Sequence, residues 1–296
     1  MLTPTAKRQK LRDLLARPHA LVAPGSYDCL TARVVEQAGF EATIVTGAGV
    51  AASVLGFPDV GLATMTEVVS QTRNMARCID IPLIADCDTG YGNPINVRRT
   101  VMEFESAGVS ALFFEDQVAP KRCGHFDGKQ VIPAEDMIAK IHAAVDARTD
   151  ATLILMARTD ARATEGVAAA IDRSRRYVEA GAEMLFVEAP ETADELAQVA
   201  GSLLPLGVPL MVNLVEGGKT PLLSVGELER MGFSLVTFSG SMQKTAIRAM
   251  QNLLASLKET GSVAAFYPSS MLSLNERSAL LGMDEFRQLE SKYAST

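Results

Sequence analysis

The chain has 296 residues, of which 48% are hydrophobic and 21% are charged, so it can bury an ample core in one large or two small domains. A formal net charge of -7 argues against a binding surface for nucleic acid or for anionic membranes. The sequence contains no run of about 18 apolar residues, which argues against a membrane-spanning helix.

The numbers and spacing of the cysteines and histidines limit which cellular compartment and which metal ligands can be expected. The four cysteines have the spacing of neither a metal finger nor a disulfide framework, and the first residues lead into an amphipathic helix without an apolar signal core. We therefore expect a cytoplasmic protein. Because only three histidines occur, a metal site would have to rely on carboxylates.

Short apolar runs alternate with amphipathic patterns along the chain. The apolar runs predict strands at residues 20–23, 43–46, 83–85, 111–114, 153–157, 184–187, 210–212 and 235–238. The amphipathic patterns predict helices at residues 29–38, 65–77, 96–107, 134–147, 165–180, 193–200 and 224–231. Four glycines can cap the ends of such helices: Gly39, Gly108, Gly181 and Gly232.

Eight strands alternating with helices over roughly 250 residues are typical of a (β/α)8 TIM-type barrel. A doubly wound open sheet is the alternative, but no Gly-rich dinucleotide loop opens the first helix. Residues 242–296 exceed what a last barrel helix needs, and they predict helices at 246–260 and 274–293 joined by a turn-rich segment. We expect one domain over residues 1–296, with an N-terminal helix and a C-terminal helical extension from about residue 242.

Polar residues follow most of the predicted strands, and in a barrel these positions share one rim. After the second strand, Thr46, Gly47 and Ala48 form a small-residue turn whose backbone amides can approach an anion; a plain tight turn is the alternative. After the third strand, Asp86 and Asp88 suit a hard divalent cation completed by water, although an aspartate can also cap a helix.

The segment after the fourth strand concentrates reactive side chains. Glu115 and Asp116 end the strand, and a thiol, Cys123, follows between Arg122 and His125. This electropositive setting is expected to lower the pKa of the thiol and to let it exchange protons near neutral pH. A surface loop with a buried structural cysteine is the alternative interpretation.

The remaining strands also end in polar residues. Arg158 closes the fifth strand and can bind a carboxylate in a bidentate fork, while Glu188, Asn213 and Ser239 follow the sixth, seventh and eighth. A structural ion pair between Arg158 and Glu188 is the alternative. Taken together, the rim residues predict a Mg²⁺-dependent enzyme acting on a small anion that carries carboxylates.

Four segments of this rim, residues 86–92, 115–117, 121–125 and 157–161, resemble motifs of the isocitrate lyase/phosphoenolpyruvate mutase superfamily. The similarity extends from Gly25 to beyond Gly261. The Lys-Arg-Cys-Gly-His loop is typical of the C–C bond lyases in it, whereas phosphonate-processing members lack the cysteine. The resemblance implies a Mg²⁺-dependent lyase that cleaves a 2-hydroxy dicarboxylate by retro-aldol chemistry. It also implies a barrel whose last helix is exchanged with a neighbouring subunit, usually in a homotetramer.

The resemblance implies roles for individual residues. It places Mg²⁺, or Mn²⁺ as a substitute, in a set of carboxylates: Asp86 and Asp88 directly or through water, with Asp59 and Glu115 around them. It makes Cys123 the acid that protonates the departing carbanion, on a mobile lid ordered by Lys121 and His125. Arg158 would bind the substrate's oxygens and stabilise the developing enolate. Further contacts to a small di- or tricarboxylate substrate are implied for Thr46, Gly47, Ala48, Gly124, Glu188, Asn213, Thr220 and Ser239.

Three positions depart from the 2-methylisocitrate lyases of this superfamily. Ile44 stands where those enzymes carry tyrosine, and Lys244 stands where they carry arginine, while residues 215–221 look more like the 2,3-dimethylmalate lyase group. Ser239 occupies a position where lyases tend to have proline and oxaloacetate hydrolases have serine. An oxaloacetate acetylhydrolase or decarboxylase on the same scaffold is therefore the alternative activity. A non-catalytic barrel is a further alternative, against which the aspartate pair and Cys123 argue.

Overall fold

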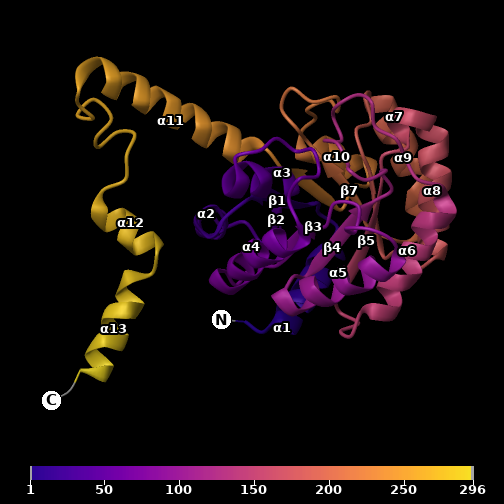
Figure 1. Cartoon of the computed structure of the whole chain (residues 1–296), viewed down its shortest axis with the longest axis horizontal. Helices are drawn as coiled ribbons and strands as arrows, with labels where there is room; N and C mark the ends of the chain where they lie inside the picture. The colour runs from indigo at the N-terminus through magenta and orange to yellow at the C-terminus, as the bar shows by residue number, and fades with distance from the viewer. Residues whose placement is uncertain (1, 295–296) are drawn as a thin grey trace. The chain divides into compact units, whose positions relative to one another are not determined.

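Eight parallel strands form a closed barrel in the computed structural model, which describes residues 2–294 (Figure 1). Each strand pairs with its successor, and β8 returns to pair with β1, with Leu21 opposite Leu235. The strands are β1 Leu21–Ser26, β2 Thr43–Val45, β3 Leu83–Asp86, β4 Ala111–Glu115, β5 Ile154–Thr159, β6 Met184–Val187, β7 Leu210–Asn213 and β8 Leu235–Phe238. The predicted (β/α)8 barrel is confirmed, and the open sheet is wrong.

Helices surround these strands (Figure 1). They are α1 Pro4–Leu15, α2 Cys29–Gln37, α3 Gly47–Val50, α4 Met65–Cys78, α5 Pro94–Ala107, α6 Ala134–Ala147, α7 Arg162–Glu165, α8 Val167–Glu179, α9 Ala193–Leu203 and α10 Val225–Met231, with a π-helix at Ala51–Leu55 and a 3-10 turn at Leu204–Leu206. The predicted helix over residues 165–180 is wrong at its start, because Gly166 at φ 90° separates α7 from α8. Gly108 and Gly232 end α5 and α10 at positive φ, as a glycine cap requires.

Helix α1 closes one end of the barrel. Its Leu11 and Leu14 are fully buried in the same apolar cluster as strand residues such as Ile84. Arg8 fixes the helix from its other side: the guanidinium donates to the carbonyl oxygens of Val109 and Glu105 and lies 2.7 Å from Asp150 Oδ2. One side chain thus ties α1 to the segments that precede β4 and β5.

Replacing Arg8 with alanine is expected to lower the free energy of unfolding by about 3 kcal/mol, because it removes the contacts of a buried guanidinium with two backbone carbonyls and the Asp150 carboxylate. Arg17→Ala is the matched control, since the Arg17–Glu41 ion pair is about half exposed on both sides and such pairs contribute less than about 1 kcal/mol. Urea denaturation of both variants checks this. Equal midpoints for the two would show that the Arg8 contacts contribute nothing specific.

The chain divides into two compact units, Met1–Ser241 and Met242–Thr296. The second unit holds most of α11 (Ser241–Thr260), followed by α12 (Leu274–Leu280) and α13 (Met283–Tyr293). A single helix over residues 274–293 was the expectation, and it is wrong because Gly282 adopts a left-handed conformation at φ 76° and separates α12 from α13. Across residues 2–294, no helix is both long enough and apolar enough to span a bilayer.

Candidate active site

Two aspartates at the end of β3 lie against the turn that follows β2. Asp86 accepts hydrogen bonds through Oδ2 from the Gly47 amide at 3.2 Å and through Oδ1 from the Asp88 amide at 3.0 Å. A Cβ on Gly47 would lie 2.9 Å from Asp88 Oδ1 and 3.3 Å from Asp86 Oδ2. Only glycine therefore leaves room for both carboxylates. The Gly47 amide, expected to bind substrate, is bonded to Asp86 here, and the Thr46 hydroxyl accepts from the Gly49 amide.

Lys121 joins this aspartate pair to the preceding loop. Its ammonium lies 2.5 Å from Asp59 Oδ1 and 2.9 Å from Asp88 Oδ1. Burial raises the pKa of Asp88 to about 6, and the Lys121 charge acts against that shift. Burial acts to lower the pKa of Lys121, but the surrounding carboxylates outweigh it and hold this pKa well above its usual value. Lys121 is thus a permanent cation between two of the residues expected near a metal.

Arg158, near the end of β5, is surrounded by carboxylates. Its Nε lies 3.1 Å from Glu115 Oε2 and 2.9 Å from Asp160 Oδ2, and its Nη2 lies 2.9 Å from Glu188 Oε2. Nη1 makes no hydrogen bond within residues 2–294. Burial raises the pKa of Glu115 well above its usual value. The Arg158–Glu188 ion pair, considered as an alternative, is present.

The loop between β4 and α6 covers this end of the barrel, and we call residues 119–129 the lid. At Gly124 a Cβ would lie 2.5 Å from both Arg158 Nη2 and Glu188 Cδ, so the lid backbone touches the rim residues. His125 Nδ1 accepts from the Lys219 amide at 3.0 Å, and its Nε2 lies 3.3 Å from Glu188 Oε1. Burial lowers the pKa of His125. The neutral ring therefore carries its hydrogen on Nε2, toward Glu188.

Cys123 is half-buried on the lid. Burial raises the pKa of its thiol, and the weaker effects of the His125 amide and of Arg158 act in the opposite direction. The expected lowering of the Cys123 pKa is therefore wrong, because desolvation outweighs the positive charges. The thiol stays protonated at neutral pH, which is the form that a proton donor needs.

Three residues to which the sequence analysis gave no role complete the rim. Asp116 is fully buried and accepts from the Thr159 hydroxyl at 2.7 Å and the Tyr177 hydroxyl at 2.8 Å. Gln117 and Lys129 bind the lid backbone. Gln117 belongs to a motif segment and Asp116 to a strand end, so position along the barrel gave a signal for both. Lys129 lies in the middle of a polar loop without such a signal.

The residues expected to bind the far end of the substrate make few contacts with one another. Asn213 ends β7, and its Oδ1 accepts from the Thr237 hydroxyl at 3.0 Å. The buried Thr220 hydroxyl has no partner within residues 2–294. Ser239 is half-buried just after β8, and its carbonyl lies so close to Gly25 that a Cβ there would clash. These residues lie at the same end of the barrel as the aspartates because each follows a parallel strand.

The donor set of the rim fits a hard divalent cation. Asp88 Oδ1 and both Glu115 carboxylate oxygens are buried and accept no hydrogen bond among residues 2–294, although Asp88 Oδ1 and Glu115 Oε2 form ion pairs with Lys121 and Arg158. Carboxylates also outnumber cations here, with Asp59, Asp86, Asp88, Glu115, Asp160 and Glu188 facing Lys121, Lys129 and Arg158. No three His, Cys, Asp or Glu side chains of the described chain converge to hold a metal unaided. A Mg²⁺ ion would complete its shell with water or substrate oxygens.

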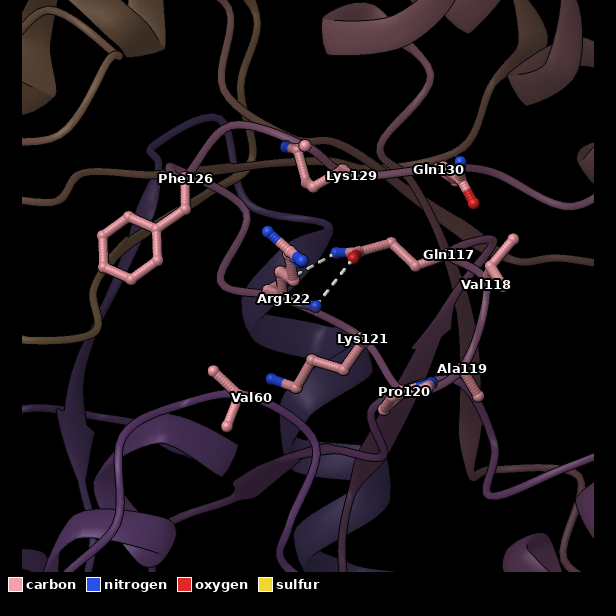
Figure 2. A pocket seen from close by; sticks show the side chains of 11 residues that line it. Val60, Gln117, Val118, Ala119, Pro120, Lys121, Arg122, Phe126, Lys129 and Gln130 are labelled. Carbon is pink, nitrogen blue, oxygen red and sulfur yellow. Dashed lines mark hydrogen bonds between the residues drawn. The ribbon is translucent and has the colours of Figure 1, made fainter.

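A cavity of about 520 Å³ lies beside the lid (Figure 2). It is lined by Val60, Phe126, Gln130, residues 117–122 and residues 128–129, which include Lys121 and Lys129, and by neither aspartate of β3 nor Arg158. The cavity therefore borders the carboxylate rim through Lys121 and Lys129, which pair with rim carboxylates. It leaves space beside the lid segment that carries Cys123.

Comparisons with known proteins agree on one family. A family model described as phosphoenolpyruvate phosphomutase matches residues 11–258. The 2,3-dimethylmalate lyase of Eubacterium barkeri is 43% identical over 286 residues, which cover 97% of this chain and 98% of that protein. A solved structure of oxaloacetate acetylhydrolase with the inhibitor 3,3-difluorooxalacetate has a TM-score of 0.94 at 34% identity, covering 100% and 99% of the two chains. Phosphonopyruvate hydrolase with oxalate and Mg²⁺ has a TM-score of 0.88 at 30% identity, covering 99% of each.

Proposed function

Given that the chain belongs to the phosphoenolpyruvate phosphomutase family, and is a carbon–carbon lyase of the isocitrate lyase superfamily, we propose that its substrate is a 2-hydroxy dicarboxylate of the 2-alkylmalate or 2-methylisocitrate type. The observation that carries this proposal is the protonated thiol of Cys123 on a lid that touches Arg158 and Glu188. A half-buried, protonated thiol beside Arg158 suits cleavage of a C–C bond, which leaves a carbanion that must receive a proton.

We propose Mg²⁺ as the cofactor, with Mn²⁺ as a possible substitute. Asp86 and Asp88 would hold the ion, with Asp59 and Glu115 around it. Three buried oxygens of Asp88 and Glu115 accept no hydrogen bond within residues 2–294, and the glycine at position 47 lets both aspartates lie against the turn after β2. Both observations support this proposal, as does the Mg²⁺ complex of a related hydrolase. When bound, the ion supplies Lewis-acid chemistry that lowers the pKa of a coordinated hydroxyl.

The chain's own residues then have separable tasks. Arg158 Nη1 orients a substrate oxygen, because Nε and Nη2 are already held by carboxylates. The closed lid excludes water from the reacting atoms. Cys123 Sγ gives its proton to the carbanion released by retro-aldol cleavage of the C2–C3 bond, and the products are a 2-oxo acid and a carboxylate. Glu188, Asn213 and Thr220 bind the far end of the substrate and thereby limit its size.

Hydrolysis or decarboxylation of oxaloacetate is the second candidate, and two observations favour it. Ser239 replaces the proline expected of a lyase, and the structure is similar over its whole length to an oxaloacetate acetylhydrolase. A serine hydroxyl at this place could bond a hydrated ketone. The half-buried position of Ser239 directly after β8 is compatible with that role.

An end-point screen of 2,3-dimethylmalate, 2-methylisocitrate, isocitrate and oxaloacetate with Mg²⁺, read by NMR, tests the two candidates. We expect cleavage of a 2-alkylmalate or of methylisocitrate. In the Ser239→Ala variant, we expect any oxaloacetate hydrolysis to fall about tenfold while lyase turnover changes little, because one neutral hydrogen bond is lost. Turnover of none of the four acids would contradict both candidates, and equal losses on every substrate would remove the special role of Ser239.

We also propose a homotetramer in the cytoplasm, with exchanged C-terminal helices. Within the second unit, α11, α12 and α13 have no buried residue. Large apolar side chains remain exposed there, including Met250, Leu254, Phe286 and Tyr293, as expected of surfaces that pack against another subunit. The four free thiols are compatible with a reducing compartment. A solution mass near that of one 31.6 kDa chain would contradict the tetramer.

A further inference from the structure

Cys123 lies between two residues whose backbone groups are each bound by a buried side chain. On its N-terminal side, the Gln117 amide pairs with both backbone groups of Arg122: the Arg122 amide donates to Oε1 at 3.0 Å, and Nε2 donates to the Arg122 carbonyl at 2.9 Å (Figure 2). Gln117 is 2% exposed and follows β4 by two residues. Its side chain therefore binds both backbone groups of Arg122, as a neighbouring strand would, and fixes the residue directly before Cys123.

On the C-terminal side of Cys123, Lys129 performs the corresponding task. Its ammonium donates to the Gly124 carbonyl and, at 3.0 Å, to Asp160 Oδ1. Both side chains of this ion pair are almost fully buried. A buried ammonium requires partners of this kind, so the position of the Gly124 carbonyl is coupled to Asp160 and, through it, to Arg158.

The two ends of the lid are held at its base. The Val118 amide donates to the Gln130 carbonyl at 2.9 Å, and the Ile132 amide donates to the Asp116 carbonyl at 2.8 Å. Gln117, two residues after β4, and Lys129, bound to Asp160, thus lie at the two ends of the segment that carries Cys123. The cavity of about 520 Å³ lies beside this segment.

We propose that Gln117 and Lys129 are positioning residues that place the Cys123 thiol for proton transfer when the lid is closed. This inference rests on the proposed function, in which Cys123 is the proton donor. Proton transfer requires a heavy-atom distance of about 2.6–3.2 Å, and a displacement of about 1 Å is enough to lower turnover strongly. Two contacts on the residues flanking Cys123 restrict its Cα from both sides.

Gln117→Glu is the sharpest test, because it keeps the shape and the acceptor for the Arg122 amide but replaces the donor to the Arg122 carbonyl with a carboxylate oxygen. Gln130→Glu is the matched control: it makes the same chemical change on an exposed residue that lines the same cavity. Lys129→Met removes the second contact. Since it also removes one of the two cations paired with Asp160 and can disturb folding, the conclusion depends on the Gln117 variant.

Two measurements follow on the full-length chain. The first is the alkylation rate of Cys123 by iodoacetamide, followed by mass spectrometry of its peptide so that the other three cysteines do not interfere. The second is kcat and KM for 2,3-dimethylmalate with Mg²⁺. For Gln117→Glu we expect alkylation at least about fivefold faster and kcat at least about fivefold lower at similar KM, the shift that loss of one hydrogen bond produces. Gln130→Glu should match the wild type.

The outcomes separate this inference from the proposed function. Wild-type alkylation and kcat in Gln117→Glu, or equal changes in Gln117→Glu and Gln130→Glu, overturn the positioning role. A parallel Cys123→Ser variant tests the donor itself: if it keeps full turnover, the proposed function fails for that reason. If Cys123→Ser is inactive while Gln117→Glu behaves as wild type, only the positioning inference fails.

Discussion

Replacing Cys123 with serine lowers turnover of the dicarboxylate at least about 100-fold and leaves its KM nearly unchanged, as expected for loss of a general acid. A serine hydroxyl has a similar shape but gives up its proton far less readily than a thiol. The raised pKa of Cys123 strengthens the expectation, because the thiol holds its proton until a strongly basic carbanion appears. Steady-state kinetics with Mg²⁺ checks this.

Cys29→Ser is the matched control for that variant. Cys29 is a half-buried free thiol at the first position of α2, outside the rim, so the substitution should leave kcat at the wild-type value. Lyase rates of the Cys123 variant that match those of the Cys29 variant would remove Cys123 from the mechanism. A rise in KM without a fall in kcat would instead make Cys123 a binding residue.

Asp88→Asn is expected to weaken Mg²⁺ binding at least about 100-fold, because the ion loses an anionic oxygen in a buried site. Asparagine suits this position, since Asp88 has a positive φ of 46°, a conformation that asparagine tolerates better than most residues. The fold should therefore persist. Titration with Mn²⁺ followed by electron paramagnetic resonance, without substrate, measures affinity independently of catalysis.

Two controls sharpen the metal test. Asp146→Asn makes the same change on an exposed residue of α6 and should leave the affinity unchanged. Gly47→Ala offers an independent route, because its Cβ would press on both aspartates, whereas Gly201→Ala in α9 meets nothing within 4 Å. We expect weakened Mn²⁺ binding in Gly47→Ala only. Unchanged affinity in both Asp88→Asn and Gly47→Ala would place the metal elsewhere.

The strands and most helices could be predicted because each apolar run is short and each helix carries an amphipathic face and an end signal. Prediction failed where the backbone conformation of a residue, and not its hydrophobicity, decides where a helix ends. The apolar pattern of residues 274–293 continues across Gly282, and only the backbone shows that this glycine ends one helix and begins another. Strand β5 extends to Thr159, two residues beyond the apolar run, because Arg158 is buried through its ion pairs.

Residues of the site could be predicted where they follow a strand, because the C-terminal ends of all strands of a parallel barrel lie on the same rim. Asp86, Glu115, Arg158 and Glu188 were placed on one rim by this rule, and the structure brings their side chains together. The pKa of Cys123 was predicted to be lowered but is raised, because the burial of the Cys123 side chain cannot be read from its neighbours in the sequence. Lys129 was missed because its importance comes from Asp160, which lies 31 residues away in the sequence.

The helix that closes the barrel has a consequence for how the chain folds. Helix α1 precedes every strand, yet its partners are synthesised much later: Lys7 binds the carbonyl of Ala76, Arg8 binds Asp150, and Arg12 binds Glu183, up to 171 residues along the chain. During translation, its apolar face cannot complete its packing until β8 has left the ribosome, because the cluster that buries Leu11 and Leu14 also includes Leu235. Contacts so distant in sequence form slowly and prolong the exposure of apolar surface. Chaperone dependence should therefore respond to changes at Leu11 and Leu14 more strongly than to equal changes in later helices.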